Sequence, residues 1–265
     1  MKSWTIEEPG SLAFEDVNEV KAFVVRGNVR VVGAPGPVRL EVTEIDRSPL
    51  HVRLTDGLLE VSHGEVNAQK IAASALSRHK KMRATVTLSV PPGCPVDLSS
   101  ATANITASGL SSRLKVFTSQ SETALANLSG PVQIESSHGR VEAITVSGPI
   151  VVKAIVADVV IADATGSVRA ETSNGSIALD ARPQAGAHLQ LASNSGPVRI
   201  GLTGLTNTKV HLESRTGAIS SQFDEVSAIE RDKLSIAKET FGTPLVDVWV
   251  RTDSGDIALL RRDDV

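Results

Sequence analysis

The chain has 265 residues, of which 41% are hydrophobic, only 3% are aromatic and none is tyrosine. This length allows one large domain or two smaller ones, and the core must be built from Val, Ile, Leu and Ala, which stack well in repeated strands. The net charge of −3 argues against a nucleic-acid partner, and the single cysteine, Cys94, excludes an intramolecular disulfide and a cysteine-rich metal site.

Neither membrane insertion nor export is predicted by the sequence. No stretch approaches the ~20 continuous apolar residues that a spanning helix needs. The first residues, MKSWTIEEPGSLAFEDV, are acidic where a signal peptide would have an apolar run. We therefore expect a cytoplasmic protein with no integral membrane segment.

Residues 1–93 are expected to form an antiparallel β layer. Apolar and polar residues alternate over short runs, as they do in half-buried strands, and turn residues separate these runs. Asp56-Gly57 is a strong hairpin signal, and Pro91-Pro92-Gly93 ends the last run. The expected strands are residues 20–26 and 29–32, joined by Gly27-Asn28, and residues 37–43, 50–54, 58–62 and 85–90.

A basic segment interrupts this layer. The Ala, Leu, Lys and Gln residues of the segment 68–82 favour a short helix or a mobile loop over a strand. A solvated loop is the favoured interpretation, and contact with an anionic membrane surface is the alternative. The basic side chains are Arg78, Lys80, Lys81 and Arg83.

A nine-residue repeat runs from Gly130 to Leu179. Each block opens with Gly or Ala, an aliphatic residue follows two places later, and another apolar residue follows two places after that. Apolar residues spaced by two indicate strands with one face inward, and a fixed period indicates stacked coils. Alternate blocks match best, so the natural unit is an eighteen-residue coil of two strands and two turns. The aliphatic positions are Val132, Val141, Ile150, Val159, Val168 and Ile177.

These patterns together predict an all-β fold. It consists of a single-stranded β-solenoid of about 18-residue coils over residues 94–262, preceded by the antiparallel layer of residues 1–93, which caps it in one continuous fold. Residues 191–200, 213–219 and 251–259 carry further copies of the repeat. The longer excursion between residues 217 and 255 is expected to hold one further strand pair.

A hydroxyl residue recurs three places before the glycine of many repeats. Such a Ser/Thr-x-x-Gly turn lets the hydroxyl bond the backbone while glycine adopts the conformation that the corner needs. No His or acidic residue accompanies these hydroxyls at a matching spacing, so a structural role is expected rather than nucleophilic catalysis. The hydroxyl residues are Thr118, Ser136, Thr172, Ser193, Ser214 and Thr252.

The repeat lacks the chemistry of three functional solenoid classes. Calcium-binding rolls place carboxylates in a G-G-x-G-x-D pattern, whereas these turns carry Ser137-His138 and Ser173-Asn174. The six-residue period of hexapeptide acyltransferases fails, and the outward sites lack the gathered acids and bases of pectate-lyase-like enzymes. The histidines show no metal-site spacing. We expect no enzyme, no cofactor and no metal, and a β-helix carbohydrate-active enzyme is the remaining catalytic alternative.

One coil differs from the rest in its outward positions. Ile144, Val151 and Val160 are apolar there, where other coils carry Glu, Arg, Lys, Thr or Ser. A strand that is apolar on both faces is usually covered on both. These three residues are therefore a candidate partner surface. The favoured interpretation is that another part of the chain covers them, and the alternative is that a second subunit does.

Several short motifs point to a family. They are the opening W-x-I-x-E-P, Gly27-Asn28-Val29, Val90-Pro91-Pro92-Gly93, the repeated Ser-x-x-Gly-x-Val and the closing residues 254–262. Together they resemble the bacterial β-strand-repeat family of candidate adhesins, also called the toastrack domain, especially its actinobacterial members. The resemblance implies a β-solenoid with no catalytic residues. Some relatives are associated with cell-envelope stress systems, and others are attached to membrane segments.

These observations favour a non-enzymatic scaffold or protein-interaction module, with a link to cell-envelope stress implied by the resemblance. Stacked strands present ladders of side chains ~4.8 Å apart, and solenoids use such extended surfaces to bind partners. We expect a protein partner or self-association. The alternative is an adhesin-like protein that binds a glycan or a host surface, for which an export signal is expected.

Overall fold

The computed structural model describes residues 1–46, 48–63, 82–231 and 234–262. Every regular element among them is a β-strand, which confirms the all-β prediction, and no helix that could cross a membrane occurs in these residues. The basic segment predicted at residues 68–82, with Arg78, Lys80 and Lys81, lies outside the described residues except for Met82. Arg83 opens a strand and forms an ion pair with Glu44 at 3.4 Å.

The chain divides into two compact units, Met1–Gly139 and Arg140–Val265. The first contains β1 (Lys2–Ile6), β2 (Gly10–Phe14), β3 (Glu19–Gly33), β4 (Val38–Ile45), β5 (Leu50–Thr55), β6 (Leu58–His63), β7 (Arg83–Val90), β8 (Val96–Ser108) and β9 (Leu114–Leu128). β10 (Val132–Val146) contains the boundary. The second contains β11 (Ile150–Ala164), β12 (Val168–Asn174), β13 (Ile177–Ala181), β14 (His188–Ser195), β15 (Val198–Leu202), β16 (Thr208–Ser214), β17 (Ile219–Ser221), β18 (Ile229–Arg231), β19 (Leu234–Thr240), β20 (Val246–Thr252) and β21 (Ile257–Arg261).

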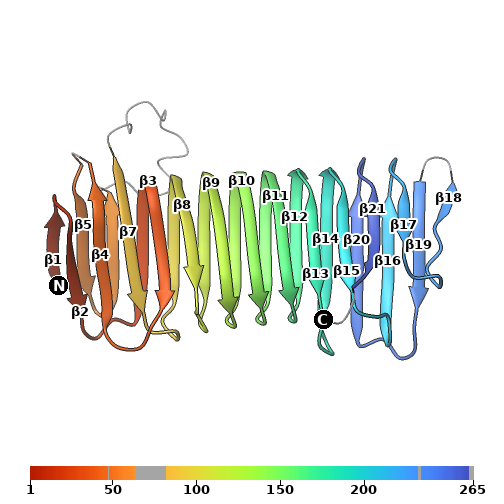
Figure 1. Cartoon of the computed structure of the whole chain (residues 1–265), viewed down its shortest axis with the longest axis horizontal. Helices are drawn as coiled ribbons and strands as arrows, with labels where there is room; N and C mark the ends of the chain where they lie inside the picture. Colours follow the sequence, from red (N-terminus) through yellow and green to blue (C-terminus); the bar gives the residue numbers. More distant parts are fainter. Residues whose placement is uncertain (47, 64–81, 232–233, 263–265) are drawn as a thin grey trace. The chain divides into compact units, whose positions relative to one another are not determined.

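The first unit is organised around β3 (Figure 1). The predicted antiparallel layer is present, because β1 pairs with β5, β5 with β6, β2 with β4 and β4 with β7, all antiparallel. β3 itself runs parallel to β6, β7 and β8. Parallel stacking therefore begins within the first ninety residues. The division predicted at residue 93 stays a prediction, and β3 pairs with strands on both sides of it.

β3 is one bent strand where the sequence predicted two strands joined by Gly27-Asn28. Gly27 makes the bend, with a φ of +111°. A Cβ at this position would lie 2.0 Å from the carbonyl oxygen of Ala84, so no other residue fits without moving β7. The first half of β3 pairs with β6 and the second half with β7, while β8 pairs with both halves.

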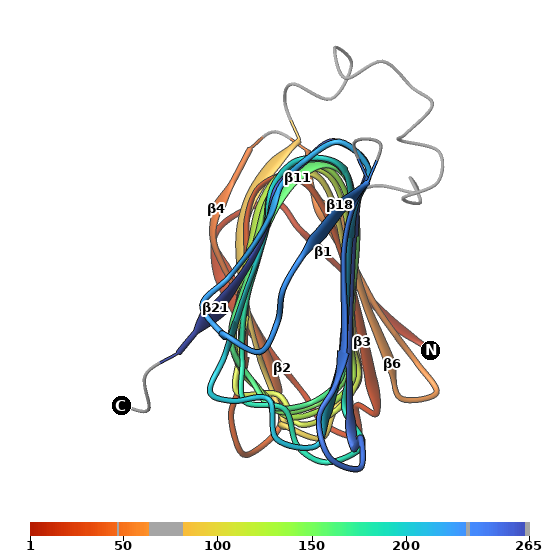
Figure 2. The same cartoon turned by 90° about the vertical axis from the view of Figure 1, so that its right-hand side faces the viewer.

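The second unit confirms the predicted period. Ile150 pairs with Val168, eighteen residues on, and Val168 pairs with Leu189, after an insertion of three residues. Each coil turns a corner between two strand segments, so parallel ladders form two separate sides. Figure 2 shows these coils one behind another, each with two long sides. The aliphatic positions of the repeat in β11, β12 and β13 are buried between the two sides.

The last repeat copies do not stack in sequence order. β20 lies between β14 and β16, parallel to both, and β21 lies between β15 and β17. The copy at residues 251–259 is thus inserted between the copies at 191–200 and 213–219. The further strand pair predicted in the excursion is β18 and β19, which pair antiparallel, and β19 also pairs with β16.

Candidate functional site

The predicted partner surface is divided by the corner of β11. Val151, before the corner, pairs with Arg169 of β12, whereas Val160, after it, pairs with Ala178 of β13. Both valines are half-buried. They point outward as predicted but belong to opposite sides of the coil, so they cannot form one flat surface.

Ile144 lies on the same side as Val160. The end of β10 runs beside the end of β11, because the Thr165 N–H donates to the Val146 carbonyl at 3.0 Å. Ile144 is 42% exposed. The structure therefore brings two of the three predicted residues together and separates Val151 from them.

The corner of β11 adds two apolar residues that the prediction missed. Ile155 is 54% exposed and Val156 is 41% exposed. In the next coil the residue paired with Val156 is the polar Asn174. The signal was present in the sequence, because Ile155 stands where the neighbouring coils carry serine. We call Val151, Ile155, Val156 and Val160 the β11 ridge, since they follow the outer side of this strand around its corner.

Polar residues interrupt the β11 ridge and anchor it. Lys153 and Asp158 are exposed between its apolar members. Asp158 accepts hydrogen bonds from the Ser176 hydroxyl at 2.7 Å and from the Ser176 N–H at 2.8 Å. These hydrogen bonds lower the pKa of the Asp158 carboxyl. The ridge thus has a fixed negative charge beside its apolar surface.

The recurring hydroxyls are structural, as expected. Ser214 donates to the Gly255 carbonyl at 2.9 Å and accepts from the Gly217 N–H at 2.9 Å. Thr252 accepts from the Gly255 N–H at 2.8 Å. All six are buried. Hydroxyls that are buried and bonded to the backbone or to each other join neighbouring coils and offer no accessible nucleophile.

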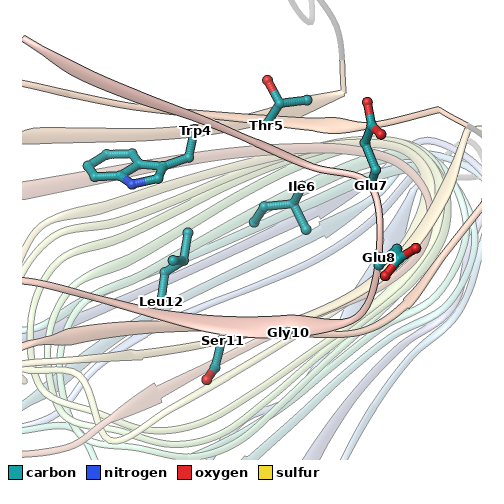
Figure 3. Close-up of a pocket in the computed structure, with 8 residues that line it drawn as sticks. All are labelled: Trp4, Thr5, Ile6, Glu7, Glu8, Gly10, Ser11 and Leu12. Atoms are coloured by element: carbon teal, nitrogen blue, oxygen red, sulfur yellow. The ribbon is translucent and has the colours of Figure 1, made fainter.

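A cavity of about 440 Å³ lies at the N-terminal end of the first unit (Figure 3). The side chains of Trp4, Ile6 and Leu12 face one another across it, between β1 and β2, and Glu7 and Glu8 lie at the turn beside it. In the sequence, Trp4 stands out only as part of a family motif. β1 and β2 lie close together because each pairs with a strand that is distant in the sequence, β5 or β4. The sequence around Trp4 therefore carries no local pattern that predicts the cavity.

Trp249 lies on one outer side of the second unit. In β20 it pairs with Gln190 of β14 and with His211 of β16. The rings of Trp249 and His211 meet edge to face, with centroids 6.3 Å apart. Neither residue was singled out from the sequence, although a second tryptophan in a chain with so few aromatic residues was a usable signal.

Two buried titratable groups show no catalytic arrangement. His63 is fully buried, and desolvation, with a smaller effect of His51, lowers its pKa to about 4. Its Nδ1 accepts a hydrogen bond from the Val25 N–H at 3.3 Å. Burial raises the pKa of the Cys94 thiol, which keeps it protonated and unreactive. The described part of the chain contains no group of three or more His, Cys, Asp or Glu residues that could hold a metal ion.

Comparison with known proteins identifies the fold family. The family model described as Toastrack DUF4097 matches residues 17–260. A candidate cell adhesion protein from Clostridium sporogenes is 11% identical over 96% of this chain and 100% of its own, with a TM-score of 0.24. A candidate adhesin from Bacteroides fragilis is 12% identical over 98% of this chain and 97% of its own, with a TM-score of 0.40. No curated protein matches significantly.

Proposed function

This chain belongs to the toastrack family, and from that premise we propose that it is a non-enzymatic β-solenoid scaffold that binds a protein partner through the β11 ridge. The observation that supports the proposal is the exposed apolar corner of β11, where Ile155 is 54% exposed and Val156 is 41% exposed. The paired corner position of the next coil is the polar Asn174.

The composition of the ridge supports this proposal. Exposed apolar area favours association by ~25 cal/mol for each Å² removed from water. An interface typically combines an apolar centre with a polar rim, and here Lys153 and Asp158 supply polar groups beside the aliphatic side chains. A ridge at a corner is convex, so it fits a partner with a groove.

The test replaces the corner with the residues of its neighbour. A double variant, Ile155→Ser with Val156→Asn, copies Ser173-Asn174 of the next coil, so the fold is expected to survive. Wild-type chain and variant are immobilised and exposed to native lysate, and retained proteins are identified by mass spectrometry. We expect a specific protein to be retained by the wild type, lost by the double variant and kept by a control variant, Arg199→Ser, at an exposed position of β15. Identical retention by all three proteins would refute the proposal.

A second candidate function, adhesion to a glycan, is favoured by Trp249. Its half-buried ring lies on a strand ladder between Gln190 and His211, and Arg251 and Asp247 are exposed in the same strand. An aromatic ring offers a stacking surface to a sugar, and the amide and charged groups around it supply hydrogen bonds. Binding to immobilised glycans that is lost in Trp249→Ala but kept in Trp4→Phe supports this candidate.

Cell fractionation distinguishes the two candidates. The scaffold proposal expects the chain in the cytoplasm, whereas adhesion requires it at the cell surface. A surface location together with Trp249-dependent glycan binding would replace the first candidate by the second.

A further inference from the structure

Among the residues that the structure describes, two strand edges at the N-terminal end of the first unit have no partner strand. β1 pairs along one edge with β5, and β2 pairs along one edge with β4. Figure 1 shows both strands outermost at this end of the unit. The backbone groups on their outer edges are therefore available to another strand. Exposed edges of this kind are sites of strand addition unless charge, proline or a covering segment blocks them.

The space between the two open edges is apolar. Trp4, Ile6 and Leu12 are half-buried and line the cavity that Figure 3 shows. The Trp4 ring meets the ring of buried Phe14 edge to face, with centroids 5.1 Å apart, which fixes its orientation. A partner that pairs with both edges would also cover this apolar surface.

We propose that this end binds the same end of a second copy of the chain, with β1 paired to β1 and β2 paired to β2, both antiparallel. Each strand has five residues, and Trp4 and Leu12 are their midpoints. Antiparallel self-pairing about a midpoint places each midpoint opposite itself. Because Trp4 and Leu12 face one another across the cavity, one two-fold axis can pass through both midpoints, so that β1 and β2 pair with their copies at the same time.

The charges of β1 fit this register. Lys2 is the only charged residue in β1, and β2 has none. Antiparallel pairing about Trp4 places Lys2 opposite Ile6 of the second copy, where β1 leads into the acidic turn Glu7-Glu8, and the two-fold axis produces this arrangement twice. This register keeps the two lysines at opposite ends of the strand pair, whereas like charges directly opposite each other would destabilise it. The parallel arrangement would instead place Lys2 beside Lys2 of the other copy.

This dimer uses a surface other than the β11 ridge, so it does not depend on the proposed function. Its first test is the solution mass of the full chain by light scattering over a range of concentrations. We expect a concentration-dependent dimer, a monomer for Leu12→Glu, and an unchanged dimer for Ile229→Glu, which places the same charge at the 72% exposed Ile229 of the second unit. A wild type that stays monomeric at every concentration, or a Leu12→Glu variant that still dimerises, would overturn the proposal.

The second test examines the register and does not depend on the folding of Leu12→Glu. Cross-strand neighbours directly opposite have Cβ atoms about 4.5–5.5 Å apart, and diagonal ones are about 7–8 Å apart. Leu12→Cys should therefore form an intermolecular disulfide, seen on a non-reducing gel, whereas Ala13→Cys should not, because Ala13 would face Ser11 of the other copy. Native Cys94 is buried and does not interfere. Equal cross-linking of the two variants, or none in Leu12→Cys, would contradict the two-fold register.

Discussion

The N-terminal end of the first unit and the C-terminal end of the second close their cores in different ways. At the N-terminal end, two five-residue strands border an apolar cavity. At the C-terminal end, the outer strands β17 and β18 have three residues each. The segment between them runs across the end of the last coil (Figure 2). Its Phe223 and Val226 are buried, and the Arg261 guanidinium lies over the Phe223 ring at 4.7 Å.

This difference shows how a stack of strands can limit its own growth. Parallel coils could in principle add further coils without end, because every edge offers the next pairing site. Short edge strands and a covering segment block addition at the C-terminal end. The N-terminal end keeps two longer edges, whose proposed self-pairing is two-fold. A two-fold contact closes on itself and gives a dimer, whereas head-to-tail contacts would give a filament.

The largest expected loss of stability comes from removing the Phe223 ring, which helps to cover the core at the C-terminal end of the second unit. Phe223→Ala deletes a buried aromatic side chain and its contact with Arg261, and we expect the free energy of unfolding of the second unit to fall by about 3–5 kcal/mol. The chain has two tryptophans, one in each unit. Urea unfolding of a Trp4→Phe background, followed by Trp249 fluorescence, therefore reports on the second unit.

The matched control for this variant is Ile229→Ala, in β18 at the same end. Because Ile229 is 72% exposed, its truncation should change the free energy of unfolding by less than about 0.5 kcal/mol. Similar losses for Phe223→Ala and Ile229→Ala would mean that the segment 222–228 does not cover the core.

The sequence predicted the repeated coils better than the order of the last coils, because the repeated coils follow a fixed period. Apolar residues at every second position identified the buried sites Val159, Val168 and Ile177, and the structure confirms them. It could not predict the order of the last coils. Val198, Ile219 and Ile257 occupy equivalent positions, so each could pair with either of the others; the observed order places Ile257 between them.

The candidate sites were only partly predictable for a related reason. Alternation showed that Val151 and Val160 point outward but not that the corner at Ile155 places them on different sides. The cavity at Trp4 depends on where β5 and β4 lie, which no local pattern encodes. The family was correctly recognised. The narrower likeness to actinobacterial members stays a prediction.

Acid should weaken the first unit more than the second. His63 is buried in its neutral form, with its pKa lowered from 6.5 to about 4. Between these values the unfolded chain binds a proton that the folded chain does not, so this contribution to stability is complete above about pH 6.5 and is lost as the pH falls towards 4. The expected loss is about 3 kcal/mol at about 1.4 kcal/mol per pH unit.

The measurement compares His63→Gln with wild type, both in a Trp249→Phe background, so that Trp4 fluorescence reports on the first unit. Gln keeps an acceptor for the Val25 N–H but does not titrate. Its free energy of unfolding should therefore depend less on pH between 7 and 4 than that of the wild type. In the second unit desolvation also lowers the pKa of His211, but this side chain is only half-buried, so we expect a smaller effect there. An equal pH slope in His63→Gln and wild type would show that His63 is not the group responsible.

The smallest expected loss of stability comes from removing a hydroxyl that joins the corners of two neighbouring coils in the second unit. Ser214 bonds both the Gly217 N–H of its own corner and the Gly255 carbonyl of the inserted coil. Ser214→Ala leaves the buried Gly255 carbonyl and the part-buried Gly217 N–H without their partner. It should cost about 1–3 kcal/mol of unfolding free energy, measured by Trp249 fluorescence. Ser254→Ala is the control, because the Ser254 hydroxyl bonds the Asn194 carbonyl at an exposed position. Since water can replace that exposed bond, its loss should be nearly silent. Equal costs at both positions would show that the buried hydroxyls do not join the inserted coil to its neighbour.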